Sequence, residues 1–410
     1  GIGAGNRRNS ERGVCMSDRI IHPLRFKFIV NVISSGKSLP EQAFANEGYP
    51  VYGGGELIGF SKIANTDKGD ILIGRVGARC GCVKYLNEKA WATDNALIIK
   101  TKNNSRFVSL LLEAANLNKI VSQDSTAQPL VTGGKIRELS MPFLTDTTEQ
   151  QQIVHFLDRK CTAIDTAIEK TKKSIEKLEE YKKAVITKAV TKGIDPNAKM
   201  KDSGVEWIGE IPEGWKVTKT KYLFRILKRI AGREGFDVIS ITQKGLKIKD
   251  ITSNEGQVAE NYSNYQFVFP GDFAMNHMDL LTGWVDLSTL TGVTSPDYRV
   301  FHKINESVND DYYKSVFQSL YFNKVYYGLA QGVAEVGRKR LQAPAFKELK
   351  LPCPPSDEPA KIAAYIKGKC MTIDALIEKK QTAINKWEEY KKSLIYYAVT
   401  GKIDCRNEVI

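Results

Sequence analysis

KCTAIDTAIEKTKKSIEKLEEYKKAVITKAVTKGID occupies Lys160–Asp195 and returns as KCMTIDALIEKKQTAINKWEEYKKSLIYYAVTGKID at Lys369–Asp404. Each residue of the second copy lies 209 positions after its counterpart, without a gap. Solenoid repeats are far shorter, roughly 20 to 50 residues, so the chain is one large module used twice. We expect each module to be a globular part followed by a long helix.

Apolar side chains in both copies recur at steps of three, four and seven, which is typical of a coiled-coil seam. Polar residues, among them Lys182 and Lys391, interrupt the same stripe. Because the first helix leads into the second globular part, which leads into the second helix, the pair is predicted to be antiparallel. The predicted seam comprises Ile153, Leu157, Cys161, Ile164, Ile168, Ile175, Leu178, Val185 and Ala189, then Ile362, Ile366, Cys370, Ile373, Ile377, Ile384, Trp387, Leu394 and Ala398.

The predicted fold class is α+β, with two α/β domains separated by an antiparallel two-helix coiled coil in a pseudo-two-fold internal repeat. Thr147 and Ser356 are expected to cap the helices, and Gly193 and Gly401 to end them. The predicted parts are a disordered leader (1–16), a first globular domain (17–145), helix one (146–195), a linker with the second domain (196–355), and helix two (356–405) with a tail to 410.

The composition favours a polyanionic partner. The chain has 60 basic and 47 acidic residues, a net charge of +13, with the excess concentrated in residues 1–145. Nucleic acid is the usual polyanion for such a chain. Seven cysteines without framework spacing indicate a reducing, cytoplasmic environment, and no apolar run is long enough to span a bilayer.

No catalytic motif emerges. Four scattered histidines do not suggest a metal site or a catalytic triad, and Cys80 and Cys82 lack a second ligand pair for zinc. Gly36-Lys37-Ser38 lacks the earlier glycine of a phosphate loop, since position 31 is Asn31. Methyltransferase boxes and nuclease carboxylate clusters are also missing from the sequence. We therefore expect a chain that is not an enzyme and binds no cofactor or metal itself.

Residues for DNA contact are chosen by chemistry: arginine and asparagine can read base edges, while lysines and hydroxyls mainly position phosphates. The three glycines Gly53–Gly55 allow a close backbone approach to a ligand or simply a tight turn. The candidates are Tyr52, Gly54, Lys62, Arg75, Arg79, Ser125, Gln128 and Lys135 in the first domain, and Lys244, Lys247, Asn276, His277, Ser295, Tyr298, Arg338 and Arg340 in the second.

With these motifs, the chain resembles a specificity subunit of a type I DNA restriction–modification system. The resemblance rests on the paired helix endings EEYKKAVITKAVTKGID and EEYKKSLIYYAVTGKID, EQQQI at Glu149, SGVEWIGEIPEGW at Ser203, YGGGELIGF at Tyr52 and GVTSPDYRVF at Gly292. It covers nearly everything after Met16. The first domain lacks an EIPEGW segment before Leu24, and EPAKI at Glu358 replaces EQQQI in the second copy.

The resemblance implies two target-recognition domains that each read one half of a split, asymmetric DNA target, with the helices as spacer. A helix over Lys160–Val190 would rise roughly 45 Å, on the order of 13 base pairs. It also implies docking of methyltransferase subunits, two in number, and a restriction and translocase subunit; S-adenosylmethionine, ATP and Mg would bind in these partners. Candidates for partner contact, which could equally form a solvated helix face, are Glu179, Tyr181, Lys183, Glu388, Tyr390 and Lys392.

A different class of function also fits these features: a non-catalytic coiled-coil scaffold that joins two protein-binding domains. Weak binding to DNA without sequence preference would favour this alternative.

Overall fold

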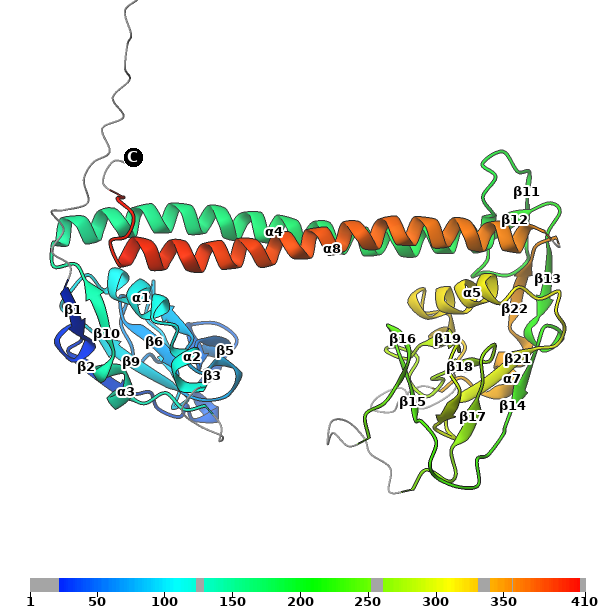
Figure 1. Ribbon diagram of the computed structural model, residues 1–410, viewed down its shortest axis with the longest axis horizontal. Helices are drawn as coiled ribbons and strands as arrows, with labels where there is room; N and C mark the ends of the chain where they lie inside the picture. The colour runs from blue at the N-terminus through cyan, green and yellow to red at the C-terminus, as the bar shows by residue number, and fades with distance from the viewer. Residues whose placement is uncertain (1–21, 123–128, 252–260, 331–339, 356, 406–410) are drawn as a thin grey trace, which may run out of the picture. The chain divides into compact units, whose positions relative to one another are not determined.

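The computed structural model describes residues 22–122, 129–251, 261–330, 340–355 and 357–405. The chain divides into a first unit, Gly1–Thr171 with Gln381–Ile410, and a second unit, Lys172–Lys380. Each unit contains both helices and strands (Figure 1), so the predicted α+β class is confirmed. The predicted leader and Ser356 lie outside the described residues.

The first unit is built on a four-stranded sheet in the order β2 (Val32–Ser35), β9 (Ala96–Lys100), β6 (Ile71–Gly74), β7 (Val83–Tyr85). All its pairings are antiparallel. Ile71, Leu72 and Ile73 are fully buried on both faces of β6, which fits a strand that reads as a continuous apolar run.

A second sheet of this unit contains the glycine-rich stretch. Its order is β3 (Phe44–Ala45), β5 (Glu56–Ser61), β4 (Tyr49–Gly53), β8 (Trp91–Ala92). Gly54 and Gly55 turn the chain between β4 and β5 with φ of 63° and 96°, values that suit glycine. β1 (His22–Arg25) pairs with β10 (Ser140–Phe143).

The helices of the first domain are shorter than the sequence predicts. One helix is expected over 105–121, but α1 (Ser105–Ala114) ends before α2 (Leu117–Ser122) begins. Asn116 lies between them with φ of 50°, which ends the first helix. α3 (Gly133–Glu138) precedes β10.

The second unit contains a four-stranded sheet in the order β14 (Phe224–Leu227), β21 (Arg299–Lys303), β18 (Phe273–Met275), β19 (Val285–Leu287). Corresponding strands therefore take the same places as in the first sheet. Phe224 lies edge-on to Phe273, Phe301 and Phe317 with ring centroids 5.1 to 5.7 Å apart. These rings form the centre of a large buried cluster.

Shorter elements complete the second unit. The paired strands are β11 (Met200–Asp202) with β12 (Glu210–Pro212), β13 (Lys216–Lys219) with β22 (Lys350–Cys353), β15 (Ile239–Thr242) with β16 (Gly245–Ile248), and β17 (Gln266–Val268) with β20 (Gly292–Thr294). The helices are α5 (Asp310–Phe322), α6 (Val325–Gly328) and α7 (Ala343–Glu348). Both linker tryptophans are fixed: the indole Nε1 of Trp215 donates to Glu358 and that of Trp207 to the Lys350 carbonyl.

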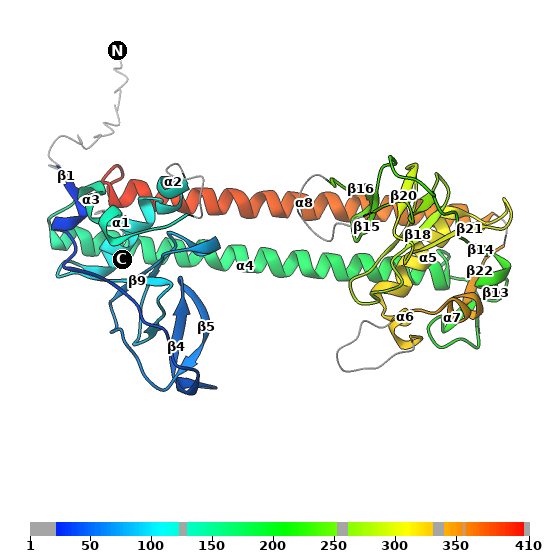
Figure 2. The ribbon, with the colours of Figure 1, turned by 90° about the horizontal axis from the view of Figure 1, so that it is seen from below.

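Two long helices, α4 (Thr147–Lys192) and α8 (Glu358–Val399), each contribute a segment to both units. Within each unit the two segments lie side by side (Figure 1, Figure 2). In the first unit Lys391 pairs with Asp165, and in the second Lys182 pairs with Asp374, all N to O distances being 2.7 to 2.8 Å. The lysines predicted in the seam thus bridge the two helices.

The globular part of each unit is attached to α4 by the helix that follows its central sheet. In the first unit Arg106 of α1 donates to Asp158 at 2.6 and 3.0 Å. In the second, the Tyr312 hydroxyl of α5 donates to the Val190 carbonyl at 2.9 Å.

Most residues of the predicted seam are buried, but the prediction is wrong for Trp387. Trp387 is 41% exposed and stacks edge-on against Tyr390 on the outer side of α8, while Ile384 and Leu394 are buried. The predicted seam residues that are buried are Ile153, Leu157, Cys161, Ile164, Ile168, Ala189, Ile362, Ile366, Ile373, Ile384, Leu394 and Ala398.

The helix ends follow the sequence except at one cap. Thr147 is not the cap of α4, because the carboxylate of Asp146 accepts from the amides of Thr148 and Glu149 at 2.8 and 3.3 Å. A carboxylate at this end also interacts favourably with the helix dipole. Gly193 and Gly401 end the helices with φ of 70° and 69°. Among the described residues, no helix has the length and apolar character needed to cross a bilayer.

Candidate nucleic-acid interface

The hairpin of β4 and β5 carries three of the first-domain candidates. Tyr52 is half-buried, the Lys84 ammonium lies 5.4 Å from its ring centre, and burial raises the pKa of its hydroxyl. Gly54 occupies the turn, and Lys62 is exposed just after β5. A Cβ on Gly54 would lie 3.6 Å from the Cβ of Arg79, an ordinary van der Waals contact. The glycine turn therefore packs closely against the segment after β6.

Two arginines follow β6 in that segment. Arg75 donates from its guanidinium to the Ser35 hydroxyl at 2.8 Å and to the Asp94 carbonyl at 3.1 Å. Arg79 is exposed and lies 3.4 Å from Glu56. Arg75 is thus held by the end of β2 and by the Asp94 carbonyl, whereas Arg79 is exposed, and both lie beside the glycine hairpin.

The remaining first-domain candidates lie in α3 and in the segment before it. Ser125 and Gln128 lie outside the described residues. The amide of Val131 donates to the Arg75 carbonyl at 2.9 Å, which brings this segment to the end of β6. Lys135 is exposed on α3, whose first turn is capped by the Thr132 hydroxyl.

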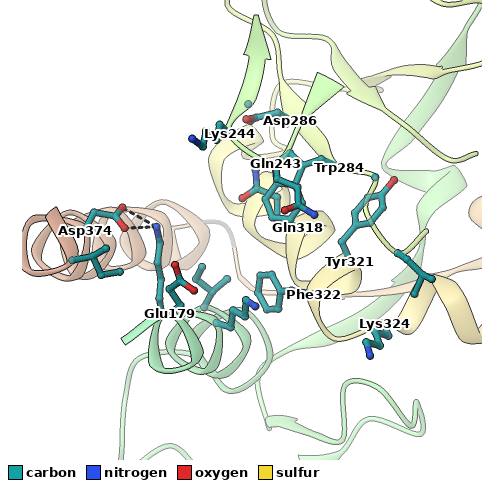
Figure 3. Close-up of a pocket in the computed structure, with 17 residues that line it drawn as sticks. Glu179, Gln243, Lys244, Trp284, Asp286, Gln318, Tyr321, Phe322, Lys324 and Asp374 are labelled. Atoms are coloured by element: carbon teal, nitrogen blue, oxygen red, sulfur yellow. Dashed lines mark hydrogen bonds and ion pairs between the residues drawn. The ribbon is translucent and has the colours of Figure 1, made fainter. Parts of the chain in front are cut away.

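In the second domain the hairpin of β15 and β16 carries Lys244 and Lys247. Lys247 lines a surface groove, whereas Lys244 lines a separate cavity. Lys247, Ser295 and Tyr298 line one groove of about 640 Å³. Lys244 instead lines a cavity of about 810 Å³ whose wall includes α4 and the ion pair of Lys182 with Asp374 (Figure 3). The structure therefore brings three predicted residues together and separates Lys244 from them.

A last group lies at the end of β18. Asn276 accepts from the Met278 amide through its side chain, and the His277 carbonyl accepts from the Leu341 amide at 3.1 Å. Burial, with Arg299 and Arg340 nearby, lowers the pKa of His277 to about 4, so the ring is neutral at pH 7. Arg340 is exposed, and Arg338 lies outside the described residues.

Sequence reasoning missed the residues that hold these loops. The amide of Gln266 donates to the carbonyls of Ser295 and Tyr298 at 2.9 and 2.7 Å, which fixes the turn that carries both candidates. Arg299 was also missed. It begins β21, whose sequence RVFHK has basic residues at both ends, so the sequence carried no signal that this arginine is buried.

The six candidates for partner contact are exposed on the long helices: Glu179, Tyr181 and Lys183 on α4, and Glu388, Tyr390 and Lys392 on α8. Tyr181 and Tyr390 are 56% and 51% exposed, a large fraction for aromatic side chains. Solvated aromatic rings of this kind are enriched where proteins meet partners.

The cysteines of the first domain do not form part of a metal site among the described residues. Cys80 is buried and Cys82 half-buried, and both are free thiols. In the part of the chain that the structure describes, no three histidine, cysteine or acidic side chains gather in a way that could hold a metal.

Comparison with known proteins finds relatives of one kind. Residues 26–180 match the family model of the type I restriction modification DNA specificity domain. The type I restriction enzyme MjaVIII specificity subunit of Methanocaldococcus jannaschii is 26% identical over 375 residues, which cover 85% of this chain and 83% of the relative. The EcoprrI specificity subunit of Escherichia coli is 32% identical over 123 residues, 30% of each chain.

A solved structure shares the fold. It comes from work on complex assembly and conformational transition of the type I restriction–modification system, has a TM-score of 0.65 at 10% identity, and covers 93% of this chain and 98% of that one. Residues 26–180 therefore match a type I restriction–modification DNA specificity domain, and the chain is similar over most of its length to a type I specificity subunit. Both relatives are specificity subunits of type I restriction enzymes.

Proposed function

We propose that this chain recognises double-stranded DNA at a bipartite, asymmetric target and directs methyltransferase and restriction subunits to it. The observation that carries the proposal is the pair of sheets with the same strand order but different side chains at the same place. Arg75 follows β6 in the first domain, whereas Asn276 and His277 follow β18 in the second. One scaffold with two different polar surfaces suits two unlike half-targets.

The two long helices are proposed to act as the spacer. An antiparallel two-helix coiled coil, related by the internal repeat, is supported by the bridges of Lys391 to Asp165 and Lys182 to Asp374. Such a spacer would set a fixed number of unread base pairs between the half-targets. The net charge of +13 supports contact with the phosphate backbone.

The partners follow from the same proposal. Two methyltransferase subunits would dock on the exposed faces of α4 and α8, one for each half of the repeat, together with a restriction and translocase subunit. S-adenosylmethionine, ATP and Mg would be bound by these partners, in the cytoplasm. Tyr181 and Tyr390, at equivalent places of the repeat, are the proposed centres of the two docking faces.

The test is to co-express the chain with its methyltransferase partner and to map methylated bases by single-molecule sequencing. The expected result is a split motif with a constant gap. Arg75→Ala should relax the half read by the first domain and leave the other half intact. A single unbroken motif, or methylation without sequence preference, would disprove the bipartite model.

A further inference from the structure

Arg299 is a buried arginine in the central sheet of the second domain. It begins β21, is only 5% exposed, and its guanidinium nitrogens donate to the Leu341 carbonyl at 2.7 Å and contact the Met275 sulfur at 4.0 Å. Within the described residues, no carboxylate contributes to its environment, and burial lowers its pKa to about 10. Leaving a charge in the interior without a counter-ion costs stability.

The fold does not require an arginine here. In the second sheet Arg299 is paired in register with Met275. In the first sheet the same register position pairs Ile73 with Leu97, and Leu97 is equally buried. The two sheets have the same strand order, so an apolar side chain satisfies this position. A reason beyond packing must account for the charge.

The contacts of Arg299 converge on one short segment. Leu341 is fully buried; its amide donates to the His277 carbonyl at 3.1 Å and its carbonyl accepts from Arg299. The guanidinium also lies 4.7 Å from the ring centre of Phe346 in α7. Both ends of 341–346 are thereby fixed. The exposed Arg340 precedes Leu341 directly, so its backbone direction is set by the same contacts.

We infer that Arg299 is a positioning residue for target recognition: from the interior it fixes Leu341 and so orients Arg340 at the DNA surface. This inference rests on the proposed function and adds a residue to it that does not touch DNA. A planar guanidinium suits this positioning role, because it can donate a hydrogen bond to the Leu341 carbonyl and lie over the Phe346 ring at the same time.

The test compares Arg299→Leu, Arg299→Lys and Arg340→Ala in the full chain co-expressed with its methyltransferase. Arg299→Leu should relax the same half-target that Arg340→Ala relaxes, with roughly a tenfold loss of discrimination at one or more bases, and should leave the other half unchanged. Arg299→Lys should restore part of the discrimination, since an ammonium can still donate to the Leu341 carbonyl.

Thermal unfolding distinguishes positioning from a structural role. Arg299→Leu removes the cost of a buried charge but leaves the buried Leu341 carbonyl without its donor, so the two effects oppose each other and the melting temperature should change little. Lys314→Met, which also removes one positive charge from this domain, should change neither the motif nor its strength. An unchanged motif in Arg299→Leu, or loss of both halves with a lowered melting temperature, would overturn the inference. If the wild-type complex itself yields no split motif, the proposed function fails first.

Discussion

Lys391 on α8 holds Asp165 on α4 with its ammonium 2.8 and 2.7 Å from the two carboxylate oxygens. Lys182 and Asp374 repeat the contact in the second unit with both residues exchanged between the helices. Asp374 is the counterpart of Asp165, and Lys391 the counterpart of Lys182, in the internal repeat. Each bridge thus joins the same two positions of the module, one from each copy.

Exchanging the charges of this pair tests its contribution to stability. Asp165→Lys should lower the free energy of unfolding by about 1 kcal/mol, because two ammonium groups would then face each other. The double exchange Asp165→Lys with Lys391→Asp should recover most of that loss. Urea unfolding of the full chain measures both effects. If the double variant does not recover the lost free energy of unfolding, the ion pair does not contribute to stability.

Trp215 should anchor the linker between the helix and the second domain. Its ring is buried edge-on to Tyr312 at 6.4 Å, and its indole donates to Glu358 at 2.8 Å. Trp215→Ala should cost about 3–5 kcal/mol through the cavity it leaves, while Trp215→Phe should cost about 1–3 kcal/mol by leaving Glu358 without its donor. The matched control, Trp207→Phe, should be milder in chemical denaturation, because that ring is less buried.

Acid should destabilise the second domain through His277. Its folded pKa is about 4, below the ordinary value of 6.5, so the unfolded chain takes up the proton first. Stability from this group is complete above pH 6.5 and is lost as pH falls towards 4, by about 2 kcal/mol after allowance for partial exposure. Replacing His277 by Asn should flatten the melting temperature across this window. His155→Asn, on the exposed face of α4, should retain the wild-type profile.

Salt dependence separates phosphate contacts from base contacts. If Lys247 neutralises a phosphate, Lys247→Ala should reduce the slope of log affinity against log salt by about 1 and weaken all sequences alike. Asn276→Ala should instead leave the slope unchanged and alter base preference in one half-target. Binding titrations at several salt concentrations, with target and scrambled duplexes, check both. An unchanged slope in Lys247→Ala would remove this lysine from the interface.

The features that the sequence predicts well are those repeated many times. The buried stripe along α4 and α8 recurs over many turns, so single exceptions do not obscure it. The strand Ala96–Lys100 and the glycine turn after Gly53 also follow from local chemistry, β-branched residues in one case and conformational freedom in the other.

The features that it predicts poorly depend on tertiary neighbours. Trp387 fits the apolar spacing, yet it is 41% exposed, whereas Ile384 and Leu394 on the same helix are buried. The cap of α4 is one residue earlier than predicted, because Asp146, rather than Thr147, is placed to accept from the amides of Thr148 and Glu149. Arg299 could be placed only once the sheet brought Leu341 beside it.

The crossed lysine and aspartate contacts have a consequence for the first module alone. Asp165 and Lys182 both belong to it, so the first copy alone carries both the acidic and the basic residue of this contact. Two identical halves could then join in the register that one full-length chain uses and would present the same reading surface twice. Such a pair would favour a palindromic sequence, and the sedimentation mass of residues 17–200 would reveal whether the halves associate.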